Sequence, residues 1–240
     1  MNEIIQSLWI GDTLSTMEQL SMNSFIKNGH EYHLYTYDTV RNIPDGVIVK
    51  DGNDILPKDS IFTYKHGDGK GSVSAFSNVF RYKLLYDKGG YWVDTDVVCL
   101  KKWDFGKEYV FASEKDSDRI KITSCVIKTP KQNQFAKYCY ERCSEIDLNN
   151  VIWGQIGPTL VGEGVSHLGL DRYVVDTSVF CPIKWFEANK SLDPSYNSDL
   201  IMKQNYAVHL WHEVWRRNGA DKDAQFHPDC LYEKLKKEYL

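Results

Sequence analysis

Two aspartates interrupt an apolar and aromatic segment at residues 91–100, near the middle of the chain. Strand interiors contain few aspartates, because a charged carboxylate there must be paired, hydrated or bound to a metal. In a strand over residues 91–100, Asp94 and Asp96 would share one face about 6.6 Å apart. Two carboxylates at that spacing can hold a hard divalent ion, Mn²⁺ or Mg²⁺. The alternative interpretation is a turn at the end of a strand.

Strand-like and helix-like segments alternate along the chain, and this alternation predicts an α/β fold with a mostly parallel sheet flanked by helices. We expect strands at residues 4–10, 33–37, 91–100, 109–113, 120–128, 173–183 and 206–211. We expect helices from Thr13 or Ser15 to about 29, at 73–88 and 133–146, after 157–158, and at 229–239, with loops over 41–72. With no linker or repeat in the sequence, residues 1–240 are predicted to form a single domain.

Charge and cysteine usage limit the partners and the compartment. The formal net charge is −4, which argues against a nucleic-acid partner, since such proteins need a basic excess. No run approaches 18 apolar residues, and the N-terminal segment lacks the features of a signal peptide, so we expect no transmembrane segment. The six cysteines contain no Cys-x-x-Cys pair and are interpreted as reduced thiols in a cytoplasmic protein. Cys139 and Cys143 are interpreted as small hydrophobic residues on one helix face.

Polar residues upstream strengthen the metal hypothesis. Asn78 and Arg81 lie three residues apart and so project from the same face of the predicted helix. A turn at Gly89 and Gly90 would bring that face to the two aspartates. A metal, an arginine and an amide in one place can hold a diphosphate and a polar ring. The alternative is that Arg81 only neutralises one aspartate in a structural ion pair.

Residues 77–100, SNVFRYKLLYDKGGYWVDTDVVCL, resemble the sugar-binding segment of the DXD glycosyltransferases of family 32. SLWIG at 7–11 resembles the opening strand of that family. IWGQIGP at 152–158 resembles a segment of its α-1,4-galactosyltransferase branch. AVHLW from residue 207, followed by Trp215, resembles a late segment that closes over the donor phosphates. The resemblance covers about residues 9–216.

The resemblance implies a GT-A type, Rossmann-like fold and a metal-dependent, retaining transfer of a sugar from a nucleotide-sugar donor, with a UDP-sugar expected, to a glycan or other hydroxyl acceptor. Residues 1–100 would form the donor-binding half, and residues 101–240 the acceptor half and a closing C-terminal segment. The implied site residues are Asp94, Asp96, Arg81 and Gln155 for catalysis; Trp9, Ile10, Gly11, Asn78, Arg81, Trp92, Asp94 and Trp215 for donor binding; and Asp96, Asp94 and His209 for the metal, Mn²⁺ or Mg²⁺. Trp9 would stack on the nucleotide base. Asn78 departs from the family pattern, which has an aspartate there that binds sugar hydroxyls.

Other interpretations of these residues stay open. Trp9 and His209 could be core residues, and Gln155 is only a candidate for lining the reactive face of the sugar. A metal-dependent nucleotide-sugar hydrolase would share the donor site but lack an acceptor groove. A non-catalytic sugar-binding module would bind the donor without turnover.

Overall fold

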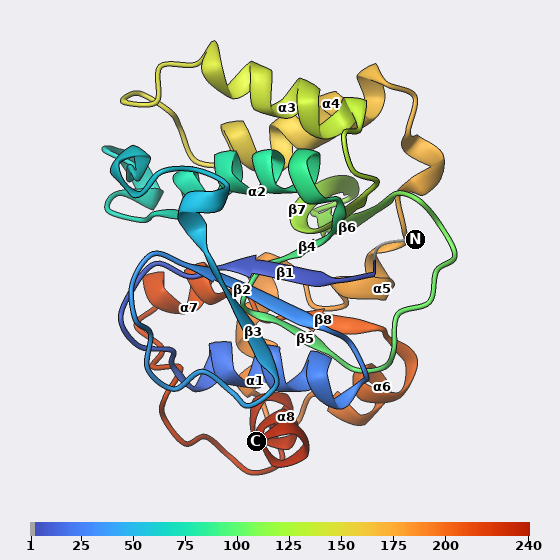
Figure 1. Ribbon diagram of the computed structural model, residues 1–240. Coiled ribbons are helices and arrows are strands. Elements are labelled where there is room, and N and C mark those ends of the chain that lie inside the picture. The colour runs from blue at the N-terminus through green and yellow to red at the C-terminus, as the bar shows by residue number, and fades with distance from the viewer. Residues whose placement is uncertain (1–2) are drawn as a thin grey trace.

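The computed structural model describes residues 3–240, and its strands build one large and one small sheet (Figure 1). The strands are β1 (Ile5–Leu8), β2 (Tyr32–Thr36), β3 (Val47–Asp51), β4 (Gly90–Val93), β5 (Val97–Cys99), β6 (Val110–Asp116), β7 (Arg119–Thr129) and β8 (Ala207–His209). The α-helices are α1 (Thr16–Lys27), α2 (Ser74–Lys88), α3 (Gln134–Ser144), α4 (Leu160–His167), α5 (Thr177–Phe180), α6 (Ser198–Gln204), α7 (His212–Arg217) and α8 (Leu231–Tyr239).

The six-stranded sheet has the order β3-β2-β1-β4-β7-β6. The pairs β3–β2, β2–β1 and β1–β4 are parallel, whereas β7 runs antiparallel to both of its neighbours, β4 and β6. Helices α2, α3 and α4 lie on one face of this sheet, and α1, α6, α7 and α8 lie toward the other (Figure 1). The predicted α/β class, a mixed and mostly parallel sheet flanked by helices, is confirmed.

The two-stranded sheet of β5 and β8 lies between the large sheet and α1. β5 pairs antiparallel with β8, and α1 packs on β5 and on α8. Hydrophobic side chains pack against both faces of the large sheet. One core cluster joins α2 to the large sheet through Phe80 and Trp92, and another joins α1 to the large sheet through Phe25 and Leu34.

Local sequence signals fix the ends of the helices near the site. Ser15 caps α1, and the Glu18 carboxylate accepts hydrogen bonds from the Ser15 backbone and hydroxyl, as in a capping box. α2 ends at Gly89, whose φ of +67° lies in the left-handed region. A Cβ at Gly89 would also lie only 2.6 Å from the backbone nitrogen of Lys131. Only glycine therefore fits the turn that leads from α2 into β4.

Three element predictions were wrong. The predicted strand over 91–100 is two strands in different sheets, because residues 94–96 form a turn between β4 and β5. The region 41–72 contains the edge strand β3, and the region 173–183 is mostly helical turns instead of a strand. β3 was missed because it buries little surface and so lacks the continuous apolar pattern of an inner strand.

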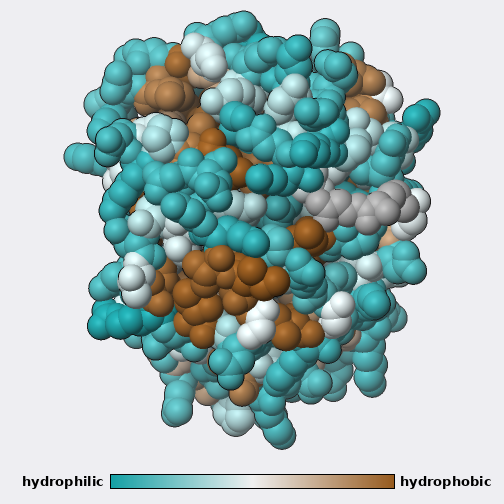
Figure 2. Space-filling model, in the orientation of Figure 1, coloured by the Kyte–Doolittle hydropathy of each residue, from teal (hydrophilic) through white to brown (hydrophobic). Residues whose placement is uncertain are grey.

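Figure 2 shows hydrophobic surface gathered near the position of β3 in Figure 1. Ile48 and Val49 of β3 are 39% and 49% exposed. None of the helices in residues 3–240 combines the length and hydrophobicity needed to cross a membrane.

Candidate active site

The site begins where two parallel strands end at the same edge of the sheet. β1 and β4 are neighbours, with Ile5 opposite Tyr91 and Gln6 opposite Trp92. Trp9 follows the end of β1, and Asp94 follows the end of β4, so the register places both at the carboxyl edge. Open α/β sheets bind ligands at this edge.

The turn at residues 94–96 connects the two sheets. The Asp94 backbone N–H donates to the Cys125 carbonyl (2.8 Å), and the Val97 N–H donates to the Asp94 carbonyl (3.1 Å). Immediately after the turn, β5 pairs with β8 so that Val97 lies opposite His209. The turn therefore brings His209, 113 residues away in sequence, beside Asp96.

Asp94 is held by two donors from the sheet and α2. Its Oδ1 accepts hydrogen bonds from Arg81 Nη2 (3.0 Å) and from Trp92 Nε1 (2.8 Å). Arg81 is buried, also donates to the Ser124 carbonyl (2.6 Å), and lies over the Trp92 ring at 4.7 Å. Burial raises the pKa of Asp94, and the Arg81 charge offsets this only in part. The ion pair proposed from sequence as an alternative role of Arg81 is therefore present.

Asp96 is held from the side of β8. His209 Nε2 lies 3.2 Å from Asp96 Oδ1, and the His212 backbone N–H donates to Oδ2 (2.8 Å). Burial alone would raise the pKa of Asp96, but the charge of His209 and the hydrogen bonds from both histidines bring it well below its usual range. Burial also disfavours a charged imidazole, yet Asp96 raises the pKa of His209 well above its usual value. Both shifts favour the charged forms, a carboxylate for Asp96 and an imidazolium for His209.

Asp94, Asp96 and His209 could together hold a metal ion. One ligand atom from each of the three lies within 4.8 Å of the others. Two carboxylates and an imidazole suit Mn²⁺, and the carboxylates alone suit Mg²⁺. Without an ion, a protonated His209 supplies positive charge beside Asp96. A bound cation would replace that charge. These residues therefore fit a divalent ion at this edge of the sheet.

Several solved glycosyltransferase structures resemble the chain at low sequence identity. The PaToxG glycosyltransferase is 11% identical with a TM-score of 0.48, over 100% of this chain and 86% of that chain. The UDP-bound glycosyltransferase domain from the YGT toxin is 10% identical with a TM-score of 0.45, over 97% of this chain and 81% of that one. GlyE of Streptococcus pneumoniae TIGR4 is 9% identical with a TM-score of 0.45, over 99% of this chain and 63% of that one. No curated protein sequence matches the chain.

Two family models match consecutive parts of the sequence. Residues 15–112, which include Asp94 and Asp96, match the glycosyltransferase sugar-binding region containing the DXD motif. Residues 128–239, which include His209, match the alpha 1,4-glycosyltransferase conserved region. The chain belongs to the DXD glycosyltransferases. The family that the sequence resembles is confirmed, and so is the prediction of a transferase enzyme.

At the carboxyl edge of the sheet, Trp9 is partly buried. The Lys222 ammonium lies 5.4 Å from the centre of its ring. The indole Nε1 is buried and has no hydrogen-bond partner among residues 3–240. Ile10 packs against the core of the α2 face, and Gly11 is exposed. A ring beside a cation, at the carboxyl edge of the sheet, is suitably placed to meet a base.

Asn78 lies where α2 meets the segment 152–158. It is buried, and a Cβ at Gly157 would lie 3.2 Å from both polar atoms of its amide. The Tyr82 hydroxyl donates to the Ile156 carbonyl (2.9 Å) on the same helix face. The Gln155 side chain accepts from the Ile152 backbone N–H (3.1 Å), so it closes its own turn. The structure therefore joins Asn78 to the Gly-Pro segment.

Two predicted donor-binding tryptophans lie inside the protein. Trp92 is 1% exposed and Trp215 is 0% exposed. Trp92 acts on the site through Asp94, as described above. Trp215 packs against Phe226 and Tyr232 in a core cluster. Neither ring offers exposed surface to a ligand.

Sequence reasoning missed three features of the site. The backbone N–H of His212 donates to Asp96. Arg217 of α7 lies over the Trp153 ring (4.6 Å) and pairs with Asp68 (3.5 Å). Cys125 and Cys181 lie beside His209. No spacing pattern signals these contacts, since the partners are far apart in sequence; only the β5–β8 pairing and the fold bring them together.

Proposed function

We propose that this glycosyltransferase moves a sugar from a UDP-sugar to a hydroxyl of a glycan acceptor. The reaction uses a divalent metal, preferably Mn²⁺, and retains the anomeric configuration of the sugar. The observation that carries the proposal is the cluster of Asp94, Asp96 and His209 at the sheet edge that also carries Trp9. A diphosphate is the donor part that needs two carboxylates with a metal, and a base is the part that an aromatic ring recognises.

A metal held by these residues would stabilise the negative charge that develops on the leaving diphosphate. Asp96 and His209 would hold it, with Asp94 oriented by Arg81 and Trp92. For the imidazole to act as a ligand, His209 must lose the proton that it shares with Asp96. Arg81 fixes the position of Asp94 and adds positive charge beside it. Asn78 would hydrogen-bond to sugar hydroxyls, and Gln155 would line the reactive face of the sugar.

The test is isothermal titration of the purified chain with UDP and other nucleoside diphosphates, with Mn²⁺, with Mg²⁺ and in excess chelator. We expect UDP binding that requires the metal and that is lost in Asp96→Ala, with folding nearly unchanged by circular dichroism. Asp116→Ala, at the far end of β6, is the matched control and should bind as the parent does. UDP binding of unchanged affinity in chelator would contradict the metal dependence.

Turnover separates transfer from hydrolysis. A panel of UDP-sugars is incubated with Mn²⁺, with and without oligosaccharide acceptors, and UDP release is measured. An acceptor-dependent rate supports transfer, whereas release at full rate without an acceptor identifies a hydrolase. Anomeric configuration of the product, read by NMR, tests retention.

A further inference from the structure

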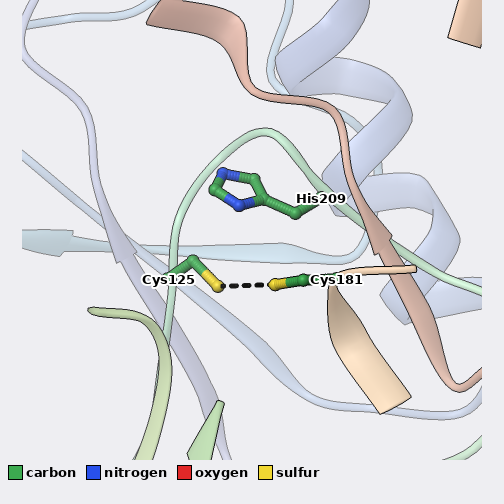
Figure 3. A group of neighbouring side chains, drawn as sticks. All are labelled: Cys125, Cys181 and His209. Carbon is green, nitrogen blue, oxygen red and sulfur yellow. Dashed lines mark hydrogen bonds between the residues drawn. The ribbon is translucent and has the colours of Figure 1, made fainter. Parts of the chain in front are cut away.

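A second group of metal-ligating side chains lies directly beside the acidic cluster. Cys125 of β7, Cys181 after α5 and His209 of β8 point toward one another (Figure 3). One ligand atom of each lies within 4.8 Å of the others, and the two sulfur atoms are 3.7 Å apart. The three residues are 1%, 3% and 6% exposed. The group thus brings together three chain segments deep inside the protein.

The two ring nitrogens of His209 face different groups. Nε2 is next to Asp96, as described above. Nδ1 is buried, and its only polar contact within the described residues is a weak one with the Cys125 thiol. Figure 3 shows one ring nitrogen directed toward the cysteine sulfurs. A thiol is a weak hydrogen-bonding group, so this buried nitrogen is poorly satisfied, and a metal ion is one group that would satisfy it.

The ligand types and their spacing favour a thiophilic ion. Two sulfurs each about 2.3 Å from a tetrahedral zinc ion lie about 3.8 Å apart, close to the separation found here. Thiolate and imidazole ligands select Zn²⁺ and similar soft ions over Mg²⁺ or Mn²⁺. The contact of Nε2 with the Asp96 carboxylate also matches the way in which zinc-binding histidines are usually oriented.

We propose that Cys125, Cys181 and His209 Nδ1 form a binding site for a soft divalent ion of the zinc class, separate from the oxygen-rich donor site. Binding replaces the two thiol protons and the Nδ1 proton of His209 by the ion, and it fixes His209 as a neutral imidazole with its Nε2 proton toward Asp96. In that state Nε2 has no free lone pair for a second metal. A soft ion at the thiol site therefore withdraws His209 from the donor metal; this consequence rests on the proposed function.

The test uses Co²⁺ as a spectroscopic substitute for zinc, added to the chelator-treated chain in a phosphine reductant without nucleotide. We expect one equivalent to produce a sulfur-to-cobalt charge-transfer band, which oxygen ligands cannot give, and Zn²⁺ to displace it. Cys125→Ser and Cys181→Ser should each lose this band. The matched control, Cys139→Ser/Cys143→Ser, removes two buried thiols of α3 and should keep it. No band in the parent chain, or an unchanged band in both single variants, would overturn the proposal.

A second measurement separates this site from the donor site. Mn²⁺ binding with UDP is followed by electron paramagnetic resonance before and after one equivalent of Zn²⁺. We expect Zn²⁺ to weaken Mn²⁺ binding by at least about tenfold in the parent chain, and to have no effect in Cys125→Ser/Cys181→Ser. A cobalt–thiolate band without any Mn²⁺–UDP binding would refute the proposed donor site alone. Mn²⁺–UDP binding without the band would refute the thiol site alone.

Discussion

Asp94 and Asp96 stand two residues apart, yet different parts of the fold hold them. Asp94 accepts from Arg81 and Trp92 on the α2 side, and Asp96 accepts from His209 and His212 on the β8 side. The pKa of Asp94 is raised and that of Asp96 is lowered, because only Asp96 has a strong enough partner to overcome burial. The negative charge of Asp96 is therefore the more strongly stabilised of the two in the metal-free chain, which supports the proposal that Asp96 is the main metal ligand.

Trp9 provides a prediction at the scale of one residue. Trp9→Ala should weaken UDP binding by about 1–3 kcal/mol, the range for a base stacked on an aromatic ring. The control is Trp185→Ala, which removes another partly exposed indole outside the site. Titration calorimetry of both variants measures the effect. If a folded Trp9→Ala protein bound UDP with unchanged affinity, Trp9 would be a packing residue only.

Gly157 provides a second residue prediction. In Gly157→Ala the new methyl group would press on the Asn78 amide, and the crowding should cost about 1–3 kcal/mol of unfolding free energy. Gly162→Ala, one turn further on in α4, meets no atom within 4 Å and should instead stabilise the helix by up to about 1 kcal/mol. Urea denaturation of the two variants gives the comparison. Equal effects would mean that the α2 contact does not constrain Gly157.

At the scale of elements, β8 and α7 connect the carboxyl edge of the sheet to the two loops that contain Asp68 and Trp153. Trp211, between them, adopts a left-handed conformation (φ 61°), which is uncommon for a tryptophan and is compatible with strain at a functional site. The turn places the Trp211 ring 3.9 Å from that of His209. α7 then carries Arg217 to Trp153 and Asp68. The segment after β8 thus contacts Asp96 and His209 as well as the loops beside α2.

Arg217→Ala should loosen these loops. Loss of the contact with the Trp153 ring and of the ion pair with Asp68 should cost about 1 kcal/mol of local stability, which corresponds to about fivefold faster amide exchange. Hydrogen–deuterium exchange should show this at residues 67–71 and 151–155. The neighbouring Arg216→Ala removes an arginine whose ion pairs are with Glu213 within α7, and should leave both loops unchanged. Similar exchange rates in both variants would show that the contacts of Arg217 with Trp153 and Asp68 do not stabilise these loops.

At the scale of the whole molecule, local patterns predicted the elements that are long and periodic. α2, for example, has a clear apolar stripe and a glycine stop, and its polar face was correctly joined to the aspartates. Such patterns could not predict the order of the strands or the existence of the small sheet. β5 and β8 have only three residues each, and their pairing depends on the packing of α1 and α8. His209 was proposed as a ligand from a resemblance, but only this pairing explains why it meets Asp96.

The Asp96–His209 pair gives a prediction for global stability, in the metal-free chain. Asp96 has a pKa lowered from 3.8, so its contribution is present above about pH 3.8 and is lost as the pH falls through the folded-state value. His209 has a pKa raised from 6.5, so its contribution is complete below pH 6.5 and is lost as the pH rises through its folded-state value. The pair should therefore stabilise the fold most between about pH 4 and pH 6.5.

His209→Gln removes the charge and keeps a hydrogen-bonding side chain of similar length, so it isolates this contribution. We expect the parent chain to exceed the variant in unfolding free energy by about 2 kcal/mol near pH 5.5, the size of a hydrogen bond to a charged group. The difference should shrink as the pH rises above 6.5. Urea denaturation in chelator from pH 4 to 9 measures it, and His227→Gln, at an exposed surface position, should not reproduce the trend. A difference that stayed constant over this range would mean that folding does not change the pKa of His209, and a difference that grew with pH would mean that His209 is neutral in the folded chain.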